Sequence, residues 1–199
     1  MAVSKGVPAT RLAAAVEAGF RSLGENRVQE AADKVPAVPG ATWHMVGHLQ
    51  GNKAARAVEL FDSIQSVGSI DLARRIDRAA GTLGRSTPYP VYLQVNVDRD
   101  RAKAGFSPES LEDELDVLVT LPNLDLLGLM TVGRWAERPE TARPTFSRLR
   151  ALSERLRSRQ PCLGEGLSMG MSDDFEVAVE EGATVLRVGR ALFGARPVV

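Results

Sequence analysis

The feature that most constrains the fold is a regular alternation, along the whole chain, between short apolar runs and amphipathic segments. The short runs are rich in β-branched and aliphatic residues, as buried strands are, and the segments between them have helical spacing. We predict eight strands, at residues 2–5, 22–26, 42–47, 63–67, 89–97, 124–131, 166–171 and 184–189. The predicted helices lie between them, at 10–18, 27–34, 52–60, 71–80, 108–119, 141–157 and 173–180.

Repeated strand–helix units predict an α/β fold. Eight strands with crossover helices close naturally into a (β/α)8 TIM barrel, and an open doubly wound sheet is the alternative. In a barrel, functional side chains gather at the carboxyl ends of the strands. Met1 leads straight into the first predicted strand, so we expect this barrel to lack a leading helix.

The bulk composition limits the classes of function. At 199 residues the chain suits a single domain, 1–199. Lys plus Arg equals Asp plus Glu at 25 each, so there is no excess positive field to attract nucleic acid or a membrane. Cys162 is the only cysteine, which rules out an intrachain disulfide, and no apolar run is long enough to cross a bilayer. We therefore expect a cytoplasmic protein without nucleic-acid or membrane partners, and we assign no metal site.

Lys5 ends the first predicted strand, directly after the apolar Ala2-Val3 pair and Ser4. This position would place its amine at the mouth of a barrel. A lysine that is desolvated or lies near other cations can lose its proton, and the uncharged amine condenses with an aldehyde. A lone lysine after a strand is more often simply solvated, so its position alone assigns no function.

Two glycine-containing segments run from the ends of the last two predicted strands into the loops that follow them. The first holds Ser168, Gly170 and Ser172, and the second holds Gly189. Backbone amides can approach an anion closely at such loops, and many barrels bind phosphate there. In a closed barrel both loops lie beside Lys5, which indicates a phosphate-bearing ligand with a carbonyl group. Pyridoxal 5′-phosphate (PLP) has that shape. The alternative is that the glycines relieve crowding in tight turns and Ser172 caps a helix.

Arg187 lies on the last predicted strand and can point inward, toward the ring nitrogen of such a ligand. A guanidinium keeps its protons, so a pyridine nitrogen that faces it stays unprotonated and is a weak electron sink. This arrangement disfavours carbanion chemistry of the transaminase type. The argument fails if Arg187 faces solvent or a surface carboxylate instead.

Eight short strings resemble the pyridoxal phosphate homeostasis proteins, the YggS/PROSC family, and occur here in the same order. They are AVSK (2–5), GENRVQE (24–30), WHMVGHLQGNK (43–53), QVN (94–96), KAGF (103–106), GLMT (128–131), LSMGMSDDFE (167–176) and RVGRALFG (187–194). The resemblance covers nearly the whole chain and implies a barrel similar to the N-terminal domain of alanine racemase. Such relatives normally begin with a helix before the lysine strand, and this sequence departs from them there.

The resemblance also implies which residues bind the cofactor. They are Lys5, Asn26, His44, Met130, Ser168, Gly170, Arg187, Gly189 and Arg190. Lys5 would carry PLP as a Schiff base, and Arg187 would face the ring nitrogen. Ser168 and the backbone near the two glycines and Arg190 would contact the phosphate.

Three of these assignments have alternatives. Asn26 and the loop 44–52 would line the other side of the ring, although His44 could equally be a packed histidine. Met130 would border the pocket or belong to the core. Arg190 stands where relatives more often have a small or hydroxylated residue, and its side chain would add charge to the phosphate only if it turned inward.

We expect the function to be intracellular PLP homeostasis, by a non-catalytic and monomeric carrier that supplies PLP to apo forms of PLP-dependent enzymes. A racemase needs a second acid or base opposite the lysine, and a shield from solvent. This chain offers only Tyr89 and Tyr92, both on the fifth predicted strand. The alternatives are an amino-acid racemase-like PLP enzyme and a phosphate-binding barrel that forms a Schiff base with its own substrate.

Overall fold

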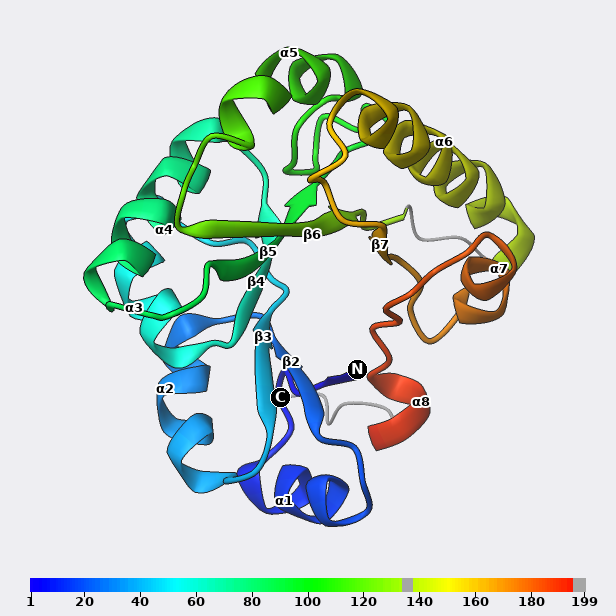
Figure 1. The fold of residues 1–199 in the computed structure, drawn as a ribbon. Helices are drawn as coiled ribbons and strands as arrows, with labels where there is room; N and C mark the ends of the chain where they lie inside the picture. The colour runs from blue at the N-terminus through cyan, green and yellow to red at the C-terminus, as the bar shows by residue number, and fades with distance from the viewer. Residues whose placement is uncertain (134–137, 195–199) are drawn as a thin grey trace.

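Seven parallel strands form one curled sheet, with helices along its outer side (Figure 1). The computed structural model describes residues 1–133 and 138–194. The strands follow chain order, and each pairs with the next one along the chain. They are β1 (Ala2–Val3), β2 (Ser22–Glu25), β3 (Thr42–Met45), β4 (Ser63–Val67), β5 (Tyr89–Gln94), β6 (Leu124–Met130) and β7 (Gly166–Ser168).

Helices connect the strands, because parallel neighbours need a long crossover. They are α1 (Ala9–Glu17), α2 (Val28–Ala37), α3 (Ala54–Leu60), α4 (Ile70–Thr82), α5 (Pro108–Leu118), α6 (Arg143–Arg159), α7 (Phe175–Glu180) and α8 (Arg190–Phe193), with 3-10 turns η1 (Gly51–Lys53) and η2 (Pro139–Ala142). Serine side chains fix the starts of α4 and α5: Ser69 Oγ accepts from the Leu72 amide at 3.3 Å, and Ser107 Oγ accepts from the Ser110 amide at 3.0 Å. No helix in the described ranges has the length and apolar character needed to span a membrane.

Seven of the eight predicted strands are confirmed, several with shorter ends, but the prediction of a regular eighth strand is wrong. Residues 184–189 make only isolated bridges, from Val185 to Ser168 and from Val188 to Ala2. Leu167 O accepts both the Thr184 and Val185 amides, at 2.9 and 3.1 Å, which breaks the even spacing of a parallel ladder. The segment still bonds to β1, because the Val3 amide donates to Val188 O at 2.9 Å.

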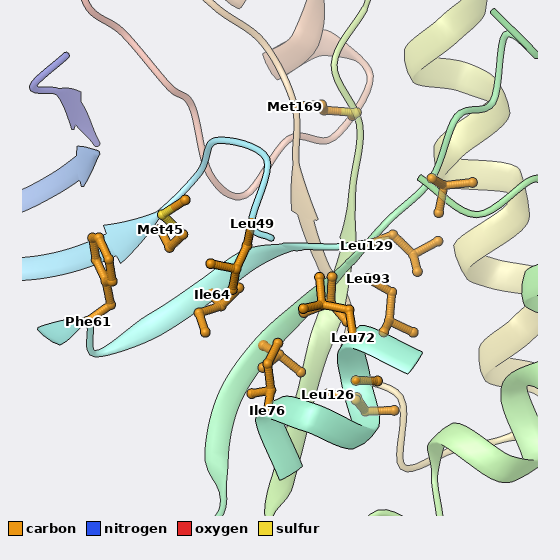
Figure 2. Packing of buried hydrophobic residues seen from close by; sticks show 14 of the residues in the cluster. Met45, Leu49, Phe61, Ile64, Leu72, Ile76, Leu93, Leu126, Leu129 and Met169 are labelled. Carbon is orange, nitrogen blue, oxygen red and sulfur yellow. The ribbon is translucent and has the colours of Figure 1, made fainter. Parts of the chain in front are cut away.

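Apolar side chains fill the layer between the sheet and the helices. Figure 2 shows Leu72 and Ile76 of α4 directed toward the strands, where Ile64 and Leu93 are fully buried. All five residues of β4 are buried, as expected for a parallel strand covered on both faces. The helices therefore hold the sheet from outside and leave its inner face for polar groups.

The inner face of the sheet carries hydrogen-bonded polar side chains. Ser168 Oγ on β7 donates to Gln65 Oε1 on β4 at 2.7 Å. These two strands are not neighbours in the sheet, so the bond crosses the interior and shows how far the sheet curls. The interior thus connects the strands through side chains as well as through the backbone.

Candidate functional site

A cavity of about 300 Å³ opens where several strands end. Val3 ends β1 and Arg190 begins α8, and the other lining residues follow β1, β2, β3, β6 and β7 or belong to the segment that leads into α8. The lining residues are Val3, Lys5, Asn26, Val46, Val132, Met171, Ser172, Asp173, Arg187, Gly189 and Arg190. Because the strands are parallel, their carboxyl ends meet at one edge of the sheet, and residues from distant parts of the chain meet there.

The cavity brings together five of the nine predicted site residues: Lys5, Asn26, Arg187, Gly189 and Arg190. Lys5 is half-buried and stands in the turn that follows β1. Within the described ranges, no hydrogen bond or ion pair ties the Lys5 side chain to another residue. Its amine is therefore available to a ligand in the cavity.

Lys34 provides a useful contrast with Lys5. Its Nζ lies 2.7 Å from Glu25 Oε2 and 3.0 Å from Glu30 Oε2, and it also donates to Ser4 O at 2.9 Å. An amine that already bonds to two carboxylates and a backbone carbonyl is engaged by the protein itself and is not free to attack the carbonyl of a ligand. Lys34 is therefore a structural lysine, although it lies close to the same turn.

Arg187 is buried, and its guanidinium is fixed by two hydrogen bonds. Nη1 donates to Ser168 Oγ at 2.8 Å, and Nη2 donates to Thr131 O at 2.7 Å. Burial lowers the pKa of Arg187 to about 10, against the opposing influence of the Asp174 carboxylate. The group therefore stays protonated at neutral pH and gives the cavity a fixed positive charge.

Three predicted residues, Ser168, Met130 and Gly170, lie behind the lining and not in it. The Ser168 hydroxyl is fully buried and is bonded to Gln65 and Arg187, so it supports the arginine. Met130 is fully buried beside Ser168 in the β6–β7 register. Gly170 has a φ of +91°, and a Cβ there would lie 2.5 Å from Ala178 Cβ. Close packing against α7 thus explains this glycine, whereas the sequence suggested an approach to an anion.

Ser172 is a lining residue that the sequence prediction did not select. Its Oγ accepts from the amides of Gly189 and Ala191, each at 3.3 Å. The hydroxyl and the two amides therefore lie together at one end of the cavity, and grouped donors of this kind can bind a phosphate. The signal was present, because Ser168 and Ser172 lie in the same short segment, 167–176, but the sequence alone did not tell which of them faces the cavity.

Arg190 lies at the rim of this end of the cavity, and its side chain forms an ion pair with Asp173. Both side chains are more than half exposed and both line the cavity. The arginine therefore turns toward the cavity rim but is already engaged by a carboxylate. The remaining lining residues, Val3, Val46, Val132 and Met171, are apolar walls that the sequence prediction did not select as site residues.

His44 does not lie in this cavity. Its ring nitrogens lie 3.0 Å from Ser22 Oγ and 2.7 Å from Ser63 Oγ, within a separate cavity of about 420 Å³. Ser22 and Ser63 are the first residues of β2 and β4, so this cavity lies toward the opposite ends of the strands. The family resemblance grouped His44 with the loop 44–52 that would line the ring, whereas the structure places it inside β3, as the predicted strand 42–47 does, with its ring beside Ser22 and Ser63.

The rest of that predicted loop lines another space. His48, Gln50 and Asn52 face a hollow of about 540 Å³ that also includes Arg75. It adjoins the loops after β3 and β4 and shares no lining residue with the cavity that holds Lys5. From this stretch, Val46 alone reaches the Lys5 cavity.

Comparison with known proteins gives this site a family. The model of the alanine racemase N-terminal domain family matches residues 1–197. The pyridoxal phosphate homeostasis protein of Aquifex aeolicus is 38% identical over 198 residues, which cover 98% of this chain and 86% of that protein. The protein of the same name from Pseudomonas aeruginosa is 41% identical over 201 residues, covering 98% and 84%. The chain belongs to the pyridoxal phosphate homeostasis protein family.

Solved structures agree with membership of the pyridoxal phosphate homeostasis protein family. PipY of Synechococcus elongatus PCC7942, solved with PLP bound, superposes with a TM-score of 0.91 at 43% identity, covering 98% of this chain and 91% of PipY. Alanine racemase of Clostridium difficile 630 gives a TM-score of 0.80 at 18% identity, and the chain covers 52% of that enzyme. The likeness to the racemase concerns the fold alone. The half-barrel that the homeostasis family shares with that enzyme is therefore the frame for the cavity described above.

Proposed function

We propose that this protein binds PLP in the cavity at the strand ends, anchored as a Schiff base on Lys5, and that it serves PLP homeostasis as a carrier. One observation carries the proposal: a half-buried lysine without a carboxylate partner among the described residues lines the same cavity as a buried arginine and a hydroxyl–amide cluster. PLP supplies an aldehyde, which condenses with an amine and releases water, and a phosphate of about two negative charges at neutral pH.

The charges and donors of the cavity fit such a ligand. Lys5, Arg187 and Arg190 contribute three cationic side chains, against the single carboxylate of Asp173. The hydroxyl and amides around Ser172 suit a phosphate at one end of the cavity. A volume of about 300 Å³ is at the lower end of the range for small-molecule sites, as a compact ligand needs. The PLP-bound structure of the family member PipY supports the same assignment.

The same residues support a carrier over a catalyst. If Arg187 faces the pyridine nitrogen, its protonated guanidinium leaves that nitrogen without a proton and so weakens the electron sink. Tyr89 and Tyr92 do not reach the cavity. Tyr89 OH donates to Phe61 O at 2.7 Å, and Tyr92 lines the opposite cavity, where burial raises its pKa. Among the described lining residues, Asp173 is the remaining acid, and it is paired with Arg190.

We also infer the wider setting of the protein. Residues 184–189 form bridges to both edge strands of the sheet, β7 and β1. These bridges support a single (β/α)8-type domain in which the eighth strand is irregular. The relatives are named for PLP homeostasis, and we infer that this protein serves it by delivering PLP to apo PLP-dependent enzymes. A single cysteine fits a reducing cytoplasm, and we expect a monomer there.

The binding proposal is tested by adding PLP, recording the visible spectrum before and after borohydride reduction, and mapping the modified peptide by mass spectrometry. We expect the label on Lys5 and no label in Lys5→Ala, with Lys53→Ala as the matched control that labels like wild type. Modification at Lys34 or Lys53, or equal spectra for wild type and Lys5→Ala, would overturn the assignment.

A second candidate function is an amino-acid racemase-like enzyme, favoured by the fold shared with alanine racemase. Incubation of the PLP-loaded protein with single L-amino acids, followed by chiral analysis, separates the two functions. A carrier gives no sustained conversion to the D-form. Repeated turnover on any amino acid would exclude the carrier and support the enzyme.

A further inference from the structure

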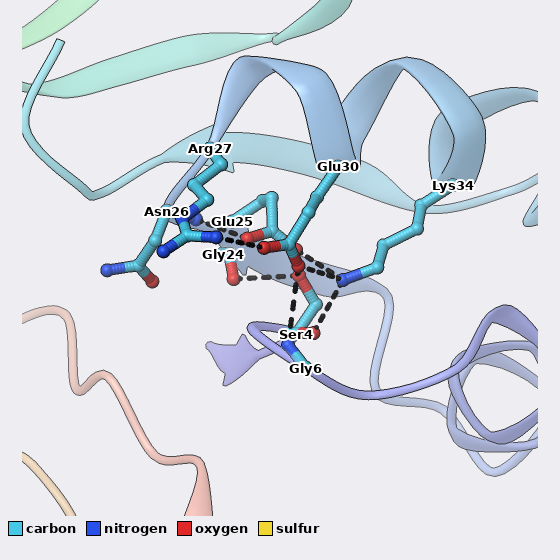
Figure 3. A network of polar contacts seen from close by, with 8 residues as sticks. All are labelled: Ser4, Gly6, Gly24, Glu25, Asn26, Arg27, Glu30 and Lys34. Carbon is cyan, nitrogen blue, oxygen red and sulfur yellow. Dashed lines mark hydrogen bonds and ion pairs between the residues drawn. The ribbon is translucent and has the colours of Figure 1, made fainter. Parts of the chain in front are cut away.

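A buried polar cluster of Ser4, Glu25, Glu30 and Lys34 lies directly against the turn that holds Lys5 (Figure 3). Glu25 is fully buried, and the Lys34 side chain is 12% exposed. Removing a carboxylate from water costs several kcal/mol, which its partners must offset. Apolar side chains in this space would avoid that desolvation cost. The charged cluster therefore needs an explanation other than packing.

The two carboxylate oxygens of Glu25 bond to different parts of the site. Oε2 accepts from Ser4 Oγ at 2.7 Å and from Lys34 Nζ at 2.7 Å. Oε1 accepts from the Asn26 amide at 2.6 Å. Ser4 immediately precedes Lys5, and Asn26 lines the cavity, so one buried carboxylate fixes the backbone on both sides of the ligand space.

The other two charged members hold the far side of the turn. Lys34 Nζ donates to Ser4 O at 2.9 Å, and Glu30 Oε2 accepts from the Gly6 amide at 3.4 Å. Partial burial pushes the pKa of Glu30 upward, but the hydrogen bonds from Lys34 and Gly6 outweigh it and hold that pKa below its ordinary value. Glu30 is thus an ionised partner at neutral pH. Both neighbours of Lys5 in the chain are therefore bonded to the cluster.

The backbone at Lys5 needs this support. β1 is two residues long, and the last β1–β2 backbone bond in this direction runs from the Ser4 amide to Gly24 O at 2.8 Å. Lys5 lies beyond it in a turn, where Gly6 has a φ of +70°. Figure 3 shows the Asn26 side chain directed away from the cluster, so its own amide group is left for the cavity. Beyond the ladder, the turn is held by one backbone bond, from the Val7 amide to Ser4 O at 2.9 Å, and by the side chains of the cluster.

We propose that Glu25 is a positioning residue, which aims the Lys5 amine and the Asn26 side chain into the cavity so that the amine meets the carbonyl of its ligand. This inference rests on the proposed function. Attack on a carbonyl depends steeply on direction and distance, and an error of about 1 Å can lower a rate on the order of 100-fold. Loss of the carboxylate should therefore slow attachment far more than it weakens the noncovalent fit.

The test compares two ligands on wild type, Glu25→Gln, Ser4→Ala and the exposed control Glu59→Gln. PLP reports covalent attachment through its visible spectrum and the rate of that change. Pyridoxine 5′-phosphate has the same ring and phosphate but no aldehyde, so it cannot form a Schiff base. Its Kd therefore measures noncovalent binding in the cavity alone. Ser4→Ala keeps the Glu25–Lys34 ion pair and removes one link to the turn, which preserves the test if Glu25→Gln does not fold.

We expect Glu25→Gln to slow PLP attachment by about tenfold or more, and Ser4→Ala to slow it by a smaller factor, while the Kd for pyridoxine 5′-phosphate changes less than about twofold. Glu59→Gln should match wild type in both. Equal losses for the two ligands would show that Glu25 only maintains the fold, and unchanged attachment would also overturn the inference. Failure of wild type itself to attach PLP at Lys5 would refute the proposed function instead.

Discussion

The hydroxyl of Ser168 donates to Gln65 Oε1 at 2.7 Å and thereby joins β7 to β4 across the inside of the sheet. The same hydroxyl accepts from Arg187 Nη1 at 2.8 Å. One serine thus holds the arginine that lines the cavity without lining the cavity itself. The polar interior of the half-barrel is therefore a support for the site, in addition to the backbone that frames it.

This relationship predicts different outcomes for Ser168, at the end of β7, and Ser172, in the segment that follows. Ser168→Ala removes one of the two hydrogen bonds of the buried Arg187 guanidinium and leaves Gln65 Oε1 without its donor, so it should lower the free energy of unfolding by about 1 to 3 kcal/mol. Ser172→Ala should change stability little and weaken PLP binding more, because Ser172 lines the cavity. Urea denaturation and PLP titration measure the two effects. A Ser168→Ala protein of normal stability that no longer binds PLP would mean that this hydroxyl contacts the phosphate directly.

The sequence predicted the fold because hydrophobic periodicity reports burial. Seven strands and the connecting helices follow directly from that pattern. The segment 184–189 has the same apolar pattern, yet the double bond of the Thr184 and Val185 amides to Leu167 O interrupts its pairing. Local composition carries no information about such a shift in register. The irregular pairing of residues 184–189 therefore could not be predicted from the sequence.

The sequence could predict those site residues whose place in the cavity depends only on their position at the end of a strand. Lys5 and Asn26 follow strand ends and therefore reach the cavity. His44 lies inside both the predicted strand 42–47 and β3, and its ring bonds to the first residues of β2 and β4, so its grouping with the ring-lining loop came from the family resemblance and not from its position along the strand. Ser168 and Gly170 were assigned to the phosphate because small residues suit both anion binding and close packing, and only the three-dimensional contacts separate these roles.

Gly170 should tolerate no side chain. Its φ of +91° disfavours L residues, and a Cβ would lie 2.5 Å from Ala178 Cβ, an atom that α7 cannot easily move. We expect Gly170→Ala to lower the free energy of unfolding by about 2 to 4 kcal/mol. Gly19→Ala is the matched control, because Gly19 has a similar φ of +98° with nothing within 4 Å, and it should cost about 1 kcal/mol. Equal losses in thermal or urea unfolding would show that backbone strain alone accounts for the glycine.

His44 should make stability depend on pH. Burial holds the pKa of His44 below its ordinary value, while Asp62 opposes this and the buried amino terminus adds to it. The unfolded chain then binds a proton more readily than the folded one, so stability falls as pH drops below about 6.5. His44→Gln should lose less stability than wild type between pH 8 and pH 5.5 in urea denaturation. Parallel pH profiles for the two proteins would contradict this role. PLP affinity should respond little to the substitution, because His44 lies in the other cavity.

Asp173 should control how long the protein retains PLP. Its carboxylate pairs with Arg190 at the cavity rim, and this pair competes with a phosphate for the same guanidinium. Asp173→Asn frees Arg190 and also removes a negative charge near the phosphate, so release of PLP into an excess of an apo PLP-dependent enzyme should slow by about two- to fivefold, the range that exposed charge pairs support. The effect should shrink as ionic strength rises.

A double-mutant cycle separates the two contributions of Asp173. If the carboxylate acts by occupying Arg190, then Asp173→Asn should have little effect on release once Arg190→Ala is present, because no guanidinium remains to be freed. If simple repulsion dominates, Asp173→Asn should slow release equally in both backgrounds, and the competition argument fails. Because both side chains are more than half exposed, neither substitution should change the unfolding midpoint appreciably, so differences in release can be assigned to the rim of the cavity.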